Sequence, residues 1–316
     1  MTSSTIETPR LGVTPEMFQR NVPIEIERHS FGEHRKASMA RVAFTTDTVE
    51  EQPDKALLSL RKRLIESPQA NAIRLSDATF RKALVNELGS PWRPGFFFIP
   101  VGLVGRADDL AQRWVAERDR LADVAASVYT GHVEAMRDKL GALFNDRDYP
   151  TVESYRRSFW ASYRFVDFGV PNLLRTVRAN VFEREARKLE AEGREAANLI
   201  QQHLRATLLG ITEHLAGLLT PKADGKLKTL RRGALDDLLG FLDTIQARNV
   251  TEDAPLMDVV ANLRGLLVSG DVSILREDKA LRAHMATIIG TAKEALEPLV
   301  VDHIRAIRFR EDEDAA

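Results

Sequence analysis

Residues 171–219 read PNLLRTVRANVFEREARKLEAEGREAANLIQQHLRATLLGITEHLAGLL and contain the strongest helical pattern of the chain. Their middle, residues 183–195, alternates acids with bases and has few large apolar side chains. This pattern is typical of a helix that is exposed on most sides, or of one arm of a coiled coil. One stripe recurs at helical spacing through Leu174, Val177, Val181, Leu189, Ala196, Leu199, His203 and Ala206. We therefore predict a long helix over 171–219.

A second stretch, residues 106–144, has the same character. Its apolar residues recur at spacings of three, four and seven, which predicts a helix roughly 58 Å long at the usual rise per residue. A short aromatic segment joins the two stretches. Together, residues 106–219 predict a long antiparallel, coiled-coil-like helical hairpin. The positions that mark the first helix are Leu110, Trp114, Leu121, Val128, Met136, Leu140 and Leu143.

The remaining chain predicts smaller elements around this hairpin. In the N-terminal segment, 1–53, Val22, Ile24 and Ile26 alternate with polar residues, and Val42 and Phe44 could form a second strand of a small β-hairpin. Residues 54–105 predict part of a helical body, including helices at 54–65 and 76–88, and residues 220–316 predict three further helices. We thus expect a mainly α fold with a small N-terminal β element.

Composition excludes several functions. The chain has no cysteine, so disulfides, cysteine–zinc sites and thiol catalysis are impossible. Its formal net charge of −1 gives no global reason for strong non-specific nucleic-acid binding. The longest apolar run, 96–104, is about half of what a membrane span needs, and the first residues are polar. We expect a cytoplasmic protein that does not enter a membrane.

No catalytic, cofactor-binding or metal-binding residue is predicted. Gly225-Lys226 is followed by leucine where a phosphate-binding loop needs serine or threonine, and neither GxGxxG nor GxSxG occurs. No two histidines share a helical turn as zinc enzymes require. His29 and His34 lie near two glutamates, but polar loops often contain histidine. An enzyme whose carboxylates assemble from separate helices remains an alternative.

The segment 155–165, YRRSFWASYRF, interleaves aromatic and basic residues. Arg156, Arg157, Trp160 and Arg164 are candidate contacts to a nucleic acid or a protein partner, because bases stack on rings while guanidinium groups hold phosphates. The alternative is structural, since Tyr155 and its neighbours at a spacing of four would pack on one helical face.

A second cluster of candidate contacts contains Lys226, Lys228, Arg231 and Arg232. It could bind an anion, although such a run more often forms a solvated loop and helix start. The aromatic run 92–100 has two interpretations as well: it could anchor a partner, or it could be a buried connection at one end of the core.

Four stretches resemble an uncharacterised family of phage and bacterial proteins, a domain of unknown function described beside MoxR-type AAA+ ATPases and von Willebrand A-type proteins. They are FGEHRK at 31–36, DRDYP at 146–150, the segments YRF and FGVP within 163–171, and ARNVTED at 247–253. The resemblance implies a helical partner or accessory protein and transfers no catalytic residue.

These observations favour a non-enzymatic interaction or assembly protein of phage origin that acts with a protein partner, an AAA+ ATPase, and that can form homo-oligomers. The alternative function is a nucleic-acid-associated protein of phage replication or recombination.

Overall fold

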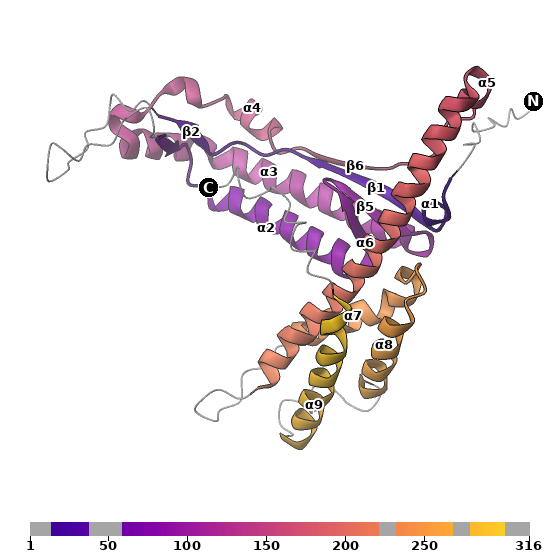
Figure 1. Cartoon of the computed structure of the whole chain (residues 1–316). Helices are drawn as coiled ribbons and strands as arrows, with labels where there is room; N and C mark the ends of the chain where they lie inside the picture. The colour runs from indigo at the N-terminus through magenta and orange to yellow at the C-terminus, as the bar shows by residue number, and fades with distance from the viewer. Residues whose placement is uncertain (1–13, 38–58, 221–231, 268–278, 301–316) are drawn as a thin grey trace, which may run out of the picture. The chain divides into compact units, whose positions relative to one another are not determined.

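The computed structural model describes residues 14–37, 59–220, 232–267 and 279–300 (Figure 1). As predicted, the protein is mostly helical and contains a small antiparallel sheet. The chain divides into two compact units that interleave along the sequence. Unit 1 contains Met1–Glu25, Lys82–Asp109 and Arg164–Ala316, and unit 2 contains Ile26–Arg81 and Leu110–Tyr163.

The larger sheet has four strands in the order β4-β5-β1-β6. The predicted strand at 22–26 is confirmed as β1 (Asn21–Arg28), but its partner is β5 (Phe96–Pro100), with Ile24 opposite Phe97. Val42 and Phe44, the expected partners, lie outside the described residues. β4 (Ser90–Arg93) joins β5 through a tight turn in which Gly95 has a φ of 79°, a conformation that favours glycine. The fourth strand is β6 (Ala161–Phe165).

The run 92–100 is therefore a buried hairpin of this sheet. Trp92, Phe97 and Phe98 are each at most 9% exposed. Trp92 and Phe98 pack on Phe18 of the short helix α1 (Glu16–Arg20), with ring centroids 5.7 and 5.5 Å from the Phe18 ring. Of the two interpretations of this run, the buried connection is the one that the structure supports.

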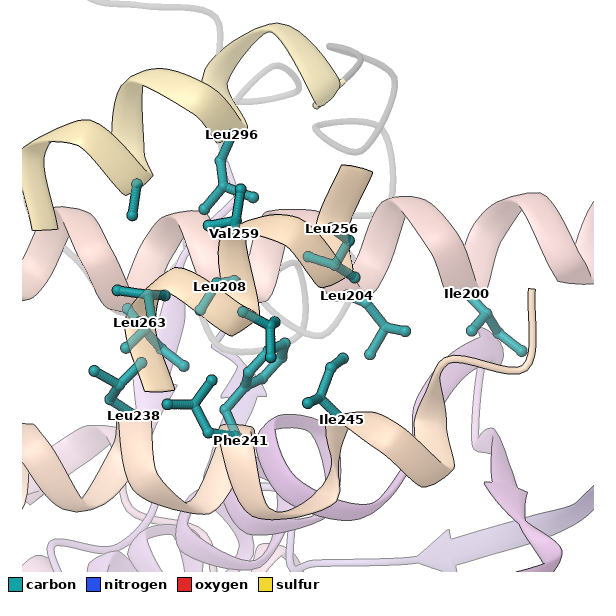
Figure 2. Close-up of a cluster of buried hydrophobic side chains, with 14 of the residues drawn as sticks. Ile200, Leu204, Leu208, Leu238, Phe241, Ile245, Leu256, Val259, Leu263 and Leu296 are labelled. Carbon is teal, nitrogen blue, oxygen red and sulfur yellow. The ribbon is translucent and has the colours of Figure 1, made fainter. Parts of the chain in front are cut away.

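Unit 1 is built on α6 (Ala179–Leu219), which packs against α7 (Arg232–Arg248) and α9 (Lys279–Leu296). α8 (Ala254–Leu267) packs against α9. Figure 2 shows their leucine-rich core, in which side chains from α6, α7 and α8 point toward one another. The buried stripe of α6 differs from the predicted one. It consists of Phe182, Gly193, Ala196, Ile200, Leu204, Leu208, Ile211, Thr212, Leu215 and Leu219.

Two helix predictions are wrong in detail. Residues 171–219 do not form one helix, because Arg178 is extended (φ −154°, ψ 96°) and separates α5 (Leu173–Val177) from α6. Within the predicted helix at 54–65, residues 61–63 form a strand, β3 (Arg61–Arg63), which pairs with β2 (His34–Lys36). The hairpin expected between 106–144 and 171–219 is not confirmed.

Unit 2 contains most of α2 (Pro68–Ala83) and of α3 (Val104–Leu140), together with α4 (Val152–Arg157). Its core includes the fully buried Ile65, Ile73 and Tyr155. Thr151 caps α4 by accepting a hydrogen bond from the Ser154 amide. Short 3₁₀ or π turns occur at Leu84–Leu88, Val101–Leu103, Gly141–Leu143, Asp146–Asp148 and Glu297–Leu299.

Candidate functional site

The segment 155–165 is not one amphipathic helix. α4 ends at Arg157, a turn follows, and β6 begins at Ala161. Tyr155 and Phe159 are 0% and 3% exposed, and the Tyr155 ring stacks on Tyr129 at 4.0 Å between centroids. The burial of Tyr155 raises its pKa to about 12. Two of the five rings in this segment therefore belong to the core of unit 2.

The three arginines predicted here as contacts each have a carboxylate partner. Arg156 donates to Asp123 at 2.7 Å and to Asp119 at 3.2 Å, and its hydrogen bond holds the pKa of Asp123 below its usual value. Arg157 pairs with Glu153 one turn earlier in α4. Arg164 pairs with Glu25. A phosphate would have to compete with these carboxylates, so the structure does not favour this segment as the nucleic-acid contact.

Trp160 is the exposed tryptophan of the segment. It is 46% exposed, whereas Trp92 and Trp114 are 9% and 4% exposed. Its ring stacks on His29 with an interplanar angle of 7° and a centroid distance of 6.5 Å. The His29 Nδ1 is 2.8 Å from the Ser158 carbonyl oxygen, which fixes the imidazole in place. Trp160 thus exposes an aromatic ring to solvent. The arginines of the same segment, however, are paired with carboxylates and are not available to hold a phosphate beside it.

Of the second basic cluster, Lys226, Lys228 and Arg231 lie outside the described residues. Arg232 is the first residue of α7, and nothing is described of its side chain. The interpretation of this cluster as an anion-binding patch stays a prediction.

A buried ionic network in unit 2 was not foreseen from the sequence. The Asp77 carboxylate, 5% exposed, accepts hydrogen bonds from Trp114 Nε1 at 2.9 Å and Arg118 Nε at 3.0 Å, and it pairs with Arg28 at 3.1 Å. Arg118 also donates to the carbonyl oxygens of Trp160 and His29. Each charged group in this network lies next to a group of opposite charge. The network therefore connects the end of β1 to the turn before β6, which is a structural role.

Unit 1 contains a buried guanidinium that caps a helix end. Arg248 is 1% exposed and donates to the carbonyl oxygens of Val85, Asn86 and Gly89, at and just beyond the π-helical turn that ends α2. The last carbonyl oxygens of a helix lack intrahelical partners in general, and a nearby cation stabilises them. Burial lowers the pKa of Arg248 to about 9, so the group still carries its charge at neutral pH.

His203 of α6 lies beside this cap. Its Nε2 is 3.2 Å from the Val85 carbonyl oxygen, so the ring is packed and hydrogen-bonded. Desolvation, together with the positive charge of Arg248, lowers the pKa of His203 from 6.5 to about 3. The imidazole is therefore neutral in the folded protein, in keeping with the position of His203 in the predicted apolar stripe of 171–219.

This pKa predicts a pH dependence of stability. Between pH 6.5 and about 3 the unfolded chain binds a proton at His203 and the folded chain does not, so the free energy of unfolding falls as the pH drops through that range. In His203→Gln the loss between pH 7 and pH 4 is expected to be smaller, measured by urea unfolding at both values. His214→Gln, an exposed histidine of the same helix, is the control. An equal loss in wild type and His203→Gln would contradict the prediction.

An arm of unit 1, residues 173–192, consists of α5 and the first turns of α6. Leu173 and Val177 of α5 are 71% and 67% exposed. They are four residues apart, so they lie on one face of the helix. Arg175 lies over the Phe182 ring at 4.5 Å and fixes α5 against α6. Residues 183–192 include no fully buried side chain, and Glu185 pairs with Arg184 and Lys188 on their surface.

A cleft of about 640 Å³ in unit 1 lies among α1, α6 and the α7–α8 loop. Arg20, one of two arginines that line it, pairs with Glu16 and Glu252 and donates to the Val250 carbonyl oxygen. Glu252 has a backbone φ of 54°, which is uncommon for a residue other than glycine. These partners hold the Arg20 guanidinium at the wall of the cleft, which Glu190 and Arg194 also line.

Among the described residues no group of histidine, aspartate and glutamate side chains could hold a metal ion. No helix in the same part of the chain is long and apolar enough to cross a membrane. Comparisons of the chain with protein-family models, with curated proteins and with solved structures found no match.

Proposed function

We propose that this chain is a non-enzymatic interaction or assembly protein that holds a protein partner through the arm at 173–192. The observation that supports this is the exposure of Leu173 and Val177 on one face of α5. Single exposed apolar residues are common on protein surfaces and need no explanation. Leu173 and Val177 are two large apolar residues at a spacing of four, on a helix that packs against α6. This spacing matches the pattern with which helices fill apolar grooves.

The charged part of the arm, in α6, is also consistent with a protein-binding surface. The charged side chains of α6 around Glu185 keep it hydrated and pair with one another, so the apolar contact is confined to α5. An apolar centre with a charged rim is the usual anatomy of a protein interface. The proposed partner is an AAA+ ATPase, and this part of the proposal, like the phage context and the hairpin of 106–219, rests on the sequence alone.

The test is affinity capture from native lysate, treated with nuclease, with wild type and Leu173→Ser/Val177→Ser. We expect the double variant to retain at least tenfold less of a stoichiometric partner, because burying two such side chains contributes about 1.5–3 kcal/mol each. The matched control is Val101→Ser/Leu239→Ser, a Val and Leu pair of the same unit that is 57% and 42% exposed. It should keep the partner.

Two outcomes would count against the proposal. One is equal loss of the partner from both double variants. The other is a strictly monomeric native mass of the wild type with no partner retained. Capture of a second copy of this chain through the same two residues would assign the arm to self-assembly. Nucleic-acid binding through Arg156, Arg157, Trp160 and Arg164 is not favoured as a second function, because the three arginines have carboxylate partners.

A further inference from the structure

The cleft of unit 1 is hollow because the centre of its floor has short side chains. The floor is one face of α6, where residues recur at spacings of three and four: Glu190, Gly193, Arg194, Ala197, Asn198 and Gln201. A β-carbon on Gly193 would lie 2.9 Å from that of Pro15, so a glycine is required for α1 to approach α6 this closely. Ala197 follows one turn later and is also short. Larger side chains therefore surround the floor without filling it.

Arg20 joins the two walls of the cleft. Its guanidinium pairs with Glu16 of its own helix α1 at 3.5 Å and with Glu252 of the α7–α8 loop at 3.4 Å. It also donates to the Val250 carbonyl oxygen of that loop at 2.9 Å. The walls are thus held in place in the absence of a ligand, and a preformed site loses little conformational entropy on binding.

Several polar groups of the lining have no partner within the part of the chain that the structure describes. The side-chain amides of Asn198 and Gln201 form no hydrogen bond there, and Glu190 forms no ion pair. The Thr251 hydroxyl is buried and has no hydrogen-bond partner among the same residues. Since buried polar groups are nearly always paired, an unpaired one at the wall of a cleft points to a ligand that supplies the partner.

The chemistry of the lining disfavours several classes of ligand. None of the described residues that line the cleft is aromatic, so nucleic-acid bases have no ring on which to stack. The carboxylates of Glu16, Glu190 and Glu252 outnumber the two guanidinium groups, which disfavours phosphates. Small apolar ligands are held by mostly hydrophobic pockets, whereas most of this lining is polar. A chain of amide groups that carries a positive charge matches the groups that are present.

We propose that this cleft binds an extended segment of another protein that carries a basic side chain. The floor from Glu190 to Gln201 is about 16 Å long at the rise of an α-helix, which is the length of about five extended residues. Each residue of such a segment has a backbone donor and an acceptor, which suit the amides of Asn198 and Gln201. Its basic side chain pairs with Glu190. The site is separate from Leu173 and Val177 of the arm, which do not line the cleft.

The test is fluorescence anisotropy of the full chain with a set of labelled pentapeptides, in which each position of an alanine background holds lysine, arginine or glutamate in turn. We expect the best basic peptide to bind at least about fivefold more tightly than any glutamate peptide. Glu190→Gln should weaken its binding about three- to fivefold, because the pair it removes is partly exposed. Ala197→Leu should weaken it at least about tenfold, because the larger side chain occupies the floor.

The matched controls are Glu195→Gln and Ala191→Leu, which change exposed residues of α6 that do not line the cleft. Both should bind the peptide as wild type does. Leu173→Ser/Val177→Ser should do so as well, so that a failure of this inference and a failure of the proposed arm can be told apart. The inference is overturned if no peptide binds, if glutamate peptides bind as tightly as basic ones, or if Glu195→Gln weakens binding as much as Glu190→Gln. If Ala197→Leu does not fold, as judged by circular dichroism, the two glutamate variants decide.

Discussion

Asp77→Ala is expected to destabilise unit 2 by about 3–5 kcal/mol, because removing one partner of a buried ion pair leaves the other charge uncompensated. The side chain of Arg118 is 1% exposed and cannot turn toward solvent without leaving the carbonyl oxygens of Trp160 and His29. Burial already lowers the pKa of Arg118, and the negative charge of Asp77 acts in the opposite direction. Without Asp77, Trp114 Nε1 also loses its acceptor.

Urea unfolding followed by tryptophan fluorescence can measure this effect for unit 2 alone. The chain has three tryptophans, and in a Trp92→Phe background the two that remain, Trp114 and Trp160, both belong to unit 2. The control is Glu117→Ala, next to Arg118 on α3, which breaks the exposed pair with Arg120. Exposed pairs contribute little, so the control should not shift the unfolding midpoint measurably.

A double variant separates the charge from the packing. Asp77→Ala/Arg118→Met no longer buries a lone cation there, so its cost should be smaller than the sum of the two single substitutions. If the costs simply add, or if Asp77→Ala behaves like Glu117→Ala, the network does not have the role assigned to it.

The sequence predicts those elements whose pattern is local. The apolar spacing of 106–144 gives α3 (Val104–Leu140) to within a few residues, and the alternation around Ile24 gives β1. β3 was missed because a short strand rich in charge has no alternating apolar pattern, and only its partner makes it a strand. β6 (ASYRF) does alternate, but its aromatic residues were assigned to one face of a helix because rings recur at a spacing of four from Tyr155. Nothing in the sequence around Arg178 marks the break between α5 and α6, since arginine is a good helix former.

Sites depend even more on contacts between distant residues. The charge of Arg156 is evident in the sequence, but its partners Asp119 and Asp123 lie more than thirty residues earlier. Charged residues are also expected to be exposed, so the burial of Arg248 could not be inferred.

Asp253→Ala is expected to destabilise unit 1 by about 3–5 kcal/mol, since it breaks a buried pair and removes a helix cap as well. The Asp253 carboxylate is 0% exposed and forms a two-pronged pair with Arg205, at 2.7 Å to Nε and 2.9 Å to Nη2. Oδ1 also accepts from the Leu256 amide in the first turn of α8. Through Arg205 Nη1, which donates to the Leu299 carbonyl oxygen, the same pair fixes the turn after α9.

Hydrogen exchange resolved by segment measures this loss where it should appear, in the amides of α8 and in those of Glu297 and Leu299. Asp253→Asn keeps an oxygen that can cap α8 and loses only the charge. Its loss of stability relative to wild type should therefore be smaller than that of Asp253→Ala. Glu252→Gln changes the adjacent residue, whose carboxylate is 79% exposed, and should leave exchange in α8 unchanged. If Asp253→Ala accelerates exchange no more than Glu252→Gln does, the pair with Arg205 does not hold α8 and the end of α9 in place.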